Sequence, residues 1–219
     1  MFDLQPTLSG ATLLLRPLCA EDWDAVFAAA SDPLIWELHP ISDRYTEASF
    51  RPYFAERLSA GGTLVVIDRV TAGVIGWSSY GGLDLAADEV EIGWTFLIRA
   101  HWGGATNAEM KVLMLTHAFR YVGTVVFRIG ETNLRSRRAM EKIGGTWNGR
   151  MTTIEVKGVA IAHCVYAITR ASFAASDIAG CCWSFWLRWI GGRRVGLRLR
   201  FFCSSRPSPI CCRFACFLR

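Results

Sequence analysis

A glycine turn that runs directly into a helix is the segment of this sequence best suited to holding a ligand. Gly103 and Gly104 follow the apolar run Trp94 to Ile98, and Thr106 precedes Glu109 by three residues. Glycines let a backbone turn sharply, and the Thr-x-x-Glu spacing is typical of a capping box. The unpaired N–H groups and the dipole of a helix start favour an anion. The sequence therefore predicts a phosphate site here; the alternative is an ordinary capped strand–turn–helix crossover.

A second motif lies further along the chain. Asn133 and Ser136 form an Asn-x-x-Ser pattern, and Glu141 to Gly144 reads Glu-Lys-Ile-Gly. In this order the two motifs resemble the acetyl-CoA-binding core of the GNAT superfamily, in its RimJ/RimL-like branch, over about Leu13 to Arg170. The resemblance implies one α/β (α+β) domain with a mixed, mostly antiparallel central sheet flanked by helices. It also implies an acetyl-CoA-dependent N-acetyltransferase.

The resemblance assigns roles to individual positions. The glycine loop would hold the CoA pyrophosphate, the N–H groups of Leu97 and Ile98 would polarise the thioester carbonyl, and Ser136 would protonate the leaving thiolate. The alternative for Ser136 is a helix-start hydroxyl. Ala100 departs from the family's Gln or Arg, and Met140 stands where many members have Tyr. The positions implied for cofactor binding are Leu97, Ile98, Trp102, Gly103, Gly104, Ala105, Thr106, Asn107, Asn133 and Arg138.

Direct acyl transfer also needs a base for the acceptor amine. Glu91 is the candidate, acting through a water, because it lies on the polar face of a predicted strand two residues before Gly93, and an isolated strand glycine often marks a bulge. The alternative is a solvated carboxylate beside Asp88 and Glu89. An α-amine with a pKa of about 7.8 is roughly 15% neutral at pH 7, whereas a lysine is under about 0.1% neutral. A single carboxylate therefore favours a protein N-terminus or a small low-pKa amine.

His39 falls where this family builds its acceptor pocket, so it is the candidate substrate-binding residue; a packing or capping histidine is the alternative. Arg138, with Arg135 and Arg137 at a helix start, is expected to contact CoA phosphates, against the alternative of a solvated basic face. The cysteines have no metal-ligand spacing with histidine, so no metal is predicted.

The elements that must position these residues follow from hydrophobic periodicity. Their predicted order is β-α-α-β-β-β-α-β-α-β-β, with a turn at Ser31–Pro33. Alternation over Asp88–Ile98 predicts that Val90, Ile92, Trp94, Phe96 and Ile98 share one face. The predicted strands are Thr12–Pro17, Thr63–Val70, Gly73–Tyr80, Asp88–Ile98, Thr124–Ile129, Met151–Val156 and Ala160–Ile168. The predicted helices are Glu21–Ala30, Tyr45–Leu58, 107–120 and 134–143.

Composition divides the chain near residue 174. Residues 1–174 hold 16 of the 24 basic and 18 of the 19 acidic side chains, whereas 175–219 hold eight arginines, no lysine and six of the eight cysteines. We therefore predict a GNAT domain over 1–174 and an Arg/Cys/Trp-rich tail over 175–219 outside the catalytic domain. A frameshift or missed stop explains such a tail better than an evolved extension. Because the net positive charge of the chain is confined to this tail, no nucleic-acid partner is predicted.

The remaining expectations concern location and partners. The N-terminus lacks a signal-peptide pattern and the body has only Cys19 and Cys164, which indicates a cytoplasmic protein. The apolar stretch Ile178–Gly192 is shorter than the roughly 20 residues of a membrane span. The expected partners are acetyl-CoA and an amine acceptor, with the chain a monomer or homodimer. The alternative function is a catalytically silent GNAT-fold module that binds CoA or a protein.

Overall fold

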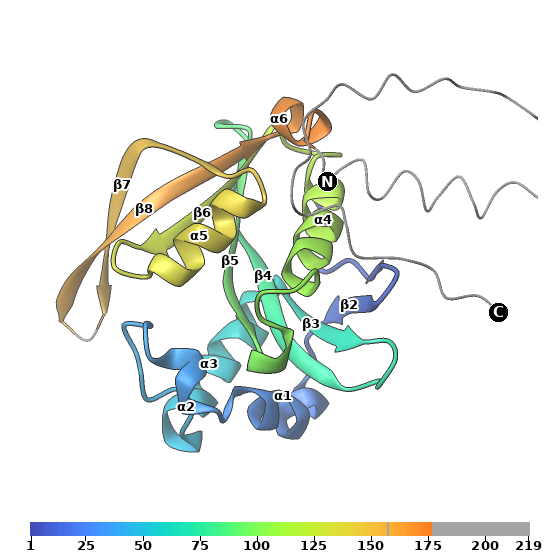
Figure 1. Cartoon of the computed structure of the whole chain (residues 1–219), viewed down its shortest axis with the longest axis vertical. Coiled ribbons are helices and arrows are strands. Elements are labelled where there is room, and N and C mark those ends of the chain that lie inside the picture. The colour runs from blue at the N-terminus through green and yellow to red at the C-terminus, as the bar shows by residue number, and fades with distance from the viewer. Residues whose placement is uncertain (157, 177–219) are drawn as a thin grey trace, which may run out of the picture.

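An eight-stranded sheet in the order β1-β2-β3-β4-β5-β6-β8-β7 forms the centre of the protein, whose computed structural model describes residues 1–156 and 158–176. Neighbouring strands are antiparallel except β5 and β6, which are parallel (Figure 1). The strands are β1 (Leu8–Ser9), β2 (Leu13–Pro17), β3 (Thr63–Asp68), β4 (Val74–Asp84), β5 (Glu89–Leu97), β6 (Thr124–Gly130), β7 (Thr146–Val156) and β8 (Val159–Thr169). The predicted mixed, mostly antiparallel sheet is confirmed. Lys157, between β7 and β8 in the sequence, and residues 177–219 lie outside the described residues.

Helices cover both faces of this sheet (Figure 1). Leu64 and Val66 of β3 belong to one hydrophobic cluster and Val65 to the other, so the two clusters lie on opposite faces. One cluster includes residues of α4 (Thr106–Ala118) and α5 (Leu134–Lys142), and the other includes residues of α1 (Trp23–Ala30), α2 (Pro33–Trp36) and α3 (Glu47–Ala60). A last short helix is α6 (Arg170–Ala174).

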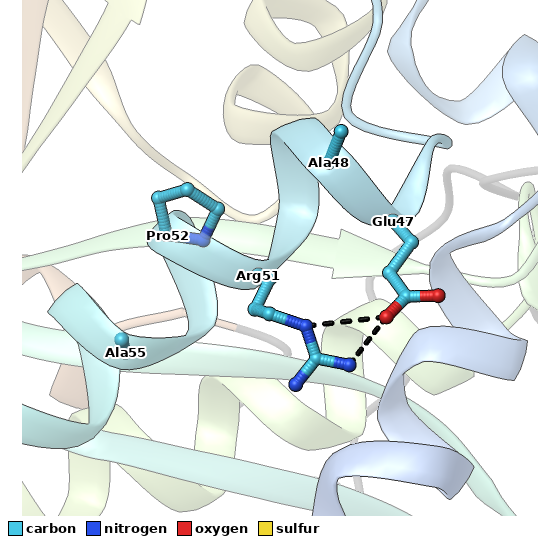
Figure 2. Close-up of a pocket in the computed structure, with 5 residues that line it drawn as sticks. All are labelled: Glu47, Ala48, Arg51, Pro52 and Ala55. Carbon is cyan, nitrogen blue, oxygen red and sulfur yellow. Dashed lines mark hydrogen bonds and ion pairs between the residues drawn. The ribbon is translucent and has the colours of Figure 1, made fainter.

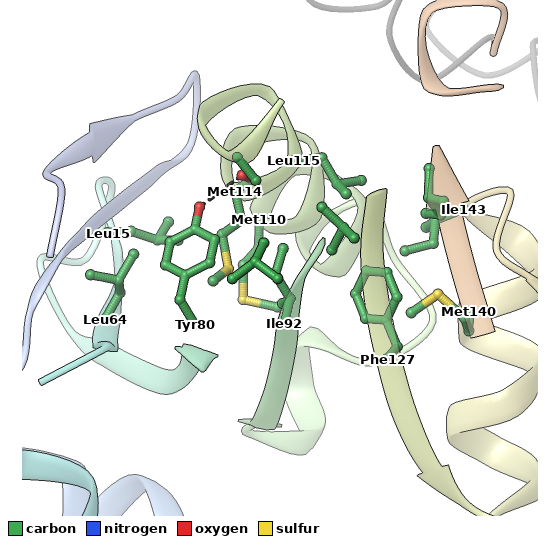
Figure 3. Packing of buried hydrophobic residues seen from close by; sticks show 14 of the residues in the cluster. Leu15, Leu64, Tyr80, Ile92, Met110, Met114, Leu115, Phe127, Met140 and Ile143 are labelled. Atoms are coloured by element: carbon green, nitrogen blue, oxygen red, sulfur yellow. Dashed lines mark hydrogen bonds between the residues drawn. The ribbon is translucent and has the colours of Figure 1, made fainter. Parts of the chain in front are cut away.

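The face that carries α4 is tightly packed. Met110, Met114 and Leu115 of α4 are fully buried, and they lie against Tyr80 and Ile92 of the sheet (Figure 3). The Tyr80 hydroxyl donates to the Met114 carbonyl at 2.7 Å, which satisfies its only donor. This packing fixes the position of α4 over the central strands.

The turn predicted at Ser31–Pro33 connects α1 to a short helix, α2, that was not predicted and begins at Pro33. The Asp32 side chain accepts a hydrogen bond from the Leu34 N–H at 3.0 Å, and Pro33 occupies the first turn of the helix. Both residue types favour these positions because they supply an acceptor and a fixed φ. The other predicted strands and helices are present, with ends shifted by a few residues.

A bulge in β5 reverses which side chains face α4. Val90 and Ile92 pack in the α4 cluster, but Trp94 and Phe96 pack in the opposite cluster. Pairing with β4 passes from Ser79–Gly93 directly to Trp77–Phe96, and Trp94 has a φ of 50°. The predicted bulge near Gly93 is confirmed, whereas the predicted single face for Val90 to Ile98 is wrong, because the extra residue inverts the alternation.

The parallel strands β5 and β6 separate just before the bulge. Their pairing runs from Glu89–Thr124 to Glu91–Val126, although β5 continues to Leu97 and β6 to Gly130. We call the parts beyond this pairing, Ile92–Leu97 and Phe127–Gly130, the β5–β6 fork. The glycine loop and α4 follow directly after β5, so they lie next to one arm of the fork.

Candidate functional site

The glycine loop leaves the start of α4 open to a ligand. Gly103 has a φ of 72°, which favours glycine, and a Cβ atom placed on Gly104 would meet nothing within 4 Å. Ala105 is the N-cap, and within the described residues no side chain caps the helix. The first-turn N–H groups of Thr106 and Asn107 therefore retain the capacity to bind an anion.

The predicted capping box is wrong. The Thr106 hydroxyl lies 3.1 Å from His101 Nδ1. The Glu109 carboxylate accepts hydrogen bonds from the Thr12 N–H at 2.8 Å and the Thr12 hydroxyl at 2.5 Å. Glu109 thus joins α4 to the start of β2, because unpaired strand donors lie within its reach. The N-cap is Ala105, which has no side-chain acceptor, so with Glu109 bound to Thr12 the α4 start has no side-chain cap.

Trp102 connects the glycine loop to both the fork and α5. Its Nε1 donates to the Leu97 carbonyl at 2.8 Å, and the Arg135 guanidinium lies 4.1 Å from its ring centroid. Arg135 also donates to Glu37 Oε1 at 3.0 Å and the Ile35 carbonyl at 3.1 Å. The two motifs recognised in the sequence are therefore brought together in space.

The Asn133 turn forms the start of α5. Asn133 Oδ1 accepts a hydrogen bond from the Ser136 N–H at 3.1 Å, so Asn133 is the N-cap. The Ser136 side chain is half-buried, whereas Arg138 is exposed. Arg137 donates to the Tyr166 hydroxyl at 3.1 Å, which ties α5 to β8. The sequence left open that Arg135, Arg137 and Arg138 form a solvated basic face. Only Arg138 is exposed in this way.

Only one of the two predicted backbone donors faces the fork. The Ile98 N–H already donates to the Ile75 carbonyl at 2.8 Å, so its predicted role toward a thioester is not supported. Successive N–H groups of a strand point to opposite edges, which directs the Leu97 N–H away from β4. The Leu97 carbonyl, on that same edge, accepts from Trp102.

Glu91 is a buried, paired carboxylate, so the alternative of a solvated strand residue is wrong. Its residue is 7% exposed, and it forms an ion pair with Arg128 of β6. Burial raises the pKa of Glu91, and the Arg128 charge and hydrogen bond partly offset that rise. Arg128 was missed in the sequence; the only signal was one charge in an otherwise apolar strand.

His39 has a packing role that accounts for both ring nitrogens. Arg44 Nη1 lies 3.0 Å from His39 Nε2, and Nδ1 lies 2.9 Å from the Ile41 nitrogen and 3.2 Å from its oxygen. Arginine can only donate, so Nε2 accepts and the ring is neutral. Burial and the Arg44 charge lower the pKa of His39 to about 4. This geometry favours the packing alternative over substrate contact.

Lys111 of α4 is a second functional candidate that sequence reasoning missed. It is 4% exposed, and its Nζ donates to Ser78 Oγ at 3.0 Å and Thr95 Oγ1 at 2.8 Å. Burial alone lowers the pKa of Lys111, to about 7. The signal in the sequence was a lysine directly after Met110, within the apolar stripe of the helix.

A surface hollow elsewhere has no relation to this site. It lies on α3 and is lined by Glu47, Ala48, Arg51, Pro52 and Ala55 (Figure 2). Arg51 is paired there with Glu47, and its guanidinium carbon lies 4.1 Å from the Trp23 ring centroid.

In the part of the chain described, no group of three or more His, Cys, Asp or Glu side chains is arranged to hold a metal ion. Nor is any described helix long and apolar enough to cross a membrane.

Several solved structures share this fold. A GCN5-related N-acetyltransferase from Brucella melitensis is similar with a TM-score of 0.69 and 21% identity, over 82% of this chain and 85% of that chain. The RimJ protein of Mycobacterium smegmatis in complex with CoA-disulfide has a TM-score of 0.59 and 18% identity, over 79% and 88%. The microcin C7 self-immunity acetyltransferase in complex with acetyl-CoA and AMP has 0.61 and 13%, over 76% and 98%.

Comparison with curated protein sequences finds no match. A family model of the acetyltransferase (GNAT) domain matches residues 12–146, which is more than half of the chain. The match spans the sheet from β2 to β6, the glycine loop, α4 and the Asn133 turn. This protein therefore belongs to the family of GNAT acetyltransferase domains.

Proposed function

We propose that this protein transfers the acetyl group of acetyl-CoA to a primary amine, as a cytoplasmic N-acetyltransferase of the RimJ/RimL-like branch. The observation that carries the proposal is that an uncapped helix start, a glycine loop and the β5–β6 fork follow one another along the chain. Together they offer donors for a pyrophosphate and an open strand edge for the thioester arm. The two cysteines among the described residues, Cys19 and Cys164, are both free, which supports a reducing compartment.

The glycine loop fits a pyrophosphate. The space beside Gly104 and the first-turn N–H groups of α4 suit an anion that approaches the backbone closely. In the proposed complex, residues Trp102 to Asn107 hold this group, with Asn133 and Arg138 nearby. The RimJ and microcin C7 structures, which contain CoA-disulfide and acetyl-CoA, support CoA as the common ligand of this fold.

In the proposed reaction the acceptor nitrogen attacks the thioester carbonyl directly. An N–C bond forms, the C–S bond breaks, and the thiolate leaves. Glu91 takes the amine proton through a water; its raised pKa makes it a stronger proton acceptor than an ordinary carboxylate. The Leu97 N–H polarises the carbonyl, and Ser136 returns a proton to the thiolate. An α-amine, at a protein N-terminus or on a small molecule, is the acceptor that one carboxylate serves best.

Gly104→Val tests the cofactor site. Because a side chain at Gly104 meets nothing within 4 Å and Gly104 has no positive φ, the variant should fold normally. Calorimetric titration with acetyl-CoA should then show at least about a tenfold loss of affinity from the blocked approach. Unchanged affinity in the folded variant would favour the ordinary crossover and remove the basis of the assignment.

Thiol release with a panel of amines tests the activity. Purified protein and acetyl-CoA should release CoA thiol fastest with peptides that carry a free α-amine. Peptides with an acetylated α-amine and one lysine are the matched comparison. Tight acetyl-CoA binding without thiol release from any amine would contradict the proposal and indicate a silent binding module.

A further inference from the structure

Lys111 is a buried cation without a carboxylate partner among the described residues. Its Nζ contacts two hydroxyl oxygens, Ser78 Oγ and Thr95 Oγ1, and lies 5.8 Å from the Phe127 ring centroid. The neighbouring positions Met110 and Met114 on the same helix are fully buried and apolar. An apolar side chain would pack here at less cost to folding, so stability does not explain the lysine.

The position of Lys111 coincides with the point where the sheet opens. Thr95 lies in the bulge of β5, and Phe127 is the first residue of β6 after the last paired residue, Val126. Lys111 Nζ therefore lies on the α4 side of the β5–β6 fork. Thr95 is exposed, whereas Ser78 is fully buried. The hydrogen bonds among Ser78, Lys111 and Thr95 thus extend from the core to the open edge of β5.

The hydrogen-bond capacities of these three groups fix where the Thr95 proton points. The Ser78 and Thr95 hydroxyl oxygens are 2.7 Å apart. In its protonated form the Lys111 amine has no lone pair, so in that form the buried Ser78 hydroxyl donates to Thr95. The Thr95 oxygen then accepts from both Ser78 and Lys111. Its own proton is left for the Gly93 carbonyl, at a long 3.3 Å, or for a group in the fork.

We propose that Lys111 and Ser78 hold the Thr95 hydroxyl as a hydrogen-bond donor to the thioester oxygen in the β5–β6 fork, which rests on the proposed acetyl transfer. As the amine attacks, the carbonyl electron pair moves onto that oxygen, and it returns when the C–S bond breaks. Thr95 stabilises the charge without giving up its proton. Thr95 is thereby a catalytic residue and Lys111 a positioning residue, and the Leu97 N–H supplies the second donor.

The test compares Thr95→Val, Thr95→Ser, Lys111→Met and the double variant Thr95→Val/Lys111→Met. Thr95→Val and Lys111→Met should each lower kcat about 10- to 100-fold while the acetyl-CoA Kd stays unchanged. Thr95→Ser, which keeps the hydroxyl, should retain most activity. Because Lys111 acts through Thr95, the double variant should be no slower than the slower single variant. Thr116→Val, on the exposed face of α4, is the matched control and should keep full activity.

A second measurement needs no acceptor amine. Infrared spectra of acetyl-CoA labelled with carbon-13 at the carbonyl should show a lowered C=O frequency on binding to the wild type. Thr95→Val and Lys111→Met should lose part of that shift. Variants that keep the full shift, or multiplicative kcat losses in the double variant, would overturn this inference alone. No acetyl-CoA binding by the wild type would overturn the proposed function and this inference together.

Discussion

Each face of β5 lies against a buried ionisable group, and the two groups differ in whether they have an oppositely charged partner. On one face Glu91 is paired with Arg128, and on the other Lys111 contacts only hydroxyl groups. Two paired buried charges offset each other's loss of hydration. Removing one of them leaves the other buried without its partner, which lowers the free energy of unfolding. An unpaired buried charge lowers stability as long as it is present. The comparison teaches that substitutions on the two faces should have opposite effects on stability and the same effect on activity.

Glu91→Gln is the largest expected change on the paired face. Loss of the proton acceptor should lower kcat about 10²- to 10⁴-fold at neutral pH, with partial recovery at higher pH as more amine is deprotonated. Arg128, whose side chain is 24% exposed, loses its ionic partner, so the unfolding free energy should fall by about 1–3 kcal/mol. Steady-state rates and urea unfolding measure the two effects.

The double variant Glu91→Gln/Arg128→Met separates the two roles of the pair. Removing both charges should restore part of the lost stability but none of the lost activity. Full activity of Glu91→Gln at every pH would show that the base is elsewhere or that the bound amine needs none.

Lys111→Met tests the unpaired face through the pH dependence of stability. The pKa of Lys111 is about 7 in the folded protein and about 10.4 in an unfolded chain. Between these values the unfolded state holds a proton that the folded state has released, so wild-type stability rises with pH by up to about 1.4 kcal/mol per unit. That contribution is present above pH 10.4 and lost as the pH falls to 7.

The methionine variant lacks this titration. Its stability advantage over the wild type should be largest at or below pH 7 and should shrink toward pH 10, as urea unfolding at several pH values would show. Parallel stability curves for the two proteins would mean that Lys111 is not buried as an unpaired cation. A gain in stability with a loss of kcat is the outcome that joins this prediction to the role inferred for Lys111.

Local patterns in the sequence were sufficient for most elements of the fold. The apolar run of β3, the Gly61 C-cap of α3 and the Asn133 N-cap of α5 each depend on residues that are close in the chain. The face assignment in β5 failed beyond Gly93 because a bulge inverts the alternation. Gly93 signalled the bulge, but no local pattern gives the conformation of Trp94, which the fold supports through a hydrogen bond from Trp77 Nε1 to its carbonyl.

The site was less predictable because its contacts are long-range. Glu109 reaches Thr12, and Glu91 meets Arg128 only through the register of two parallel strands joined by a helix. Neither partner follows from spacing. Lys111 is different, since its place in an apolar helical stripe already indicated a buried charge. The lysine in the apolar stripe of α4, like the arginine in the apolar strand β6, was thus a local signal of a buried charge.

His39→Gln adds to the comparison of Glu91 and Lys111 a third buried ionisable group, one that is neutral in the folded protein. The pKa of His39 is about 4 in the folded protein against about 6.5 unfolded, so the unfolded state takes up a proton first on acidification. This contribution is complete above pH 6.5 and lost as the pH falls toward 4, by at most about 3 kcal/mol. Glutamine keeps an acceptor for Arg44 without titrating, so the variant should lose less stability between these pH values in urea unfolding. Equal losses in both proteins would contradict the buried neutral histidine.

Truncation tests whether residues 1–176 contain everything that packs against β5. Of the changes considered, it is expected to alter stability and activity least. We propose that the domain ends near residue 174 and that the Arg- and Cys-rich tail is not part of it. Removing residues 177–219 should leave the thermal midpoint and acetyl-CoA affinity unchanged and raise solubility, because the tail's composition is apolar and cationic.

Removing residues 173–219 is the matched comparison, because it also takes Phe173, whose ring centroid lies 5.3 Å from that of Phe119 in the α4 cluster. Loss of that half-buried ring should lower the unfolding free energy by about 1 kcal/mol relative to the protein that ends at residue 176. The boundary of the domain would then lie between residues 173 and 176, within α6 and the turn that follows it. If the protein that ends at residue 176 already lost acetyl-CoA binding or unfolded, the tail would belong to the domain, and the effects of Glu91 and Lys111 on stability would have to be measured on the full chain.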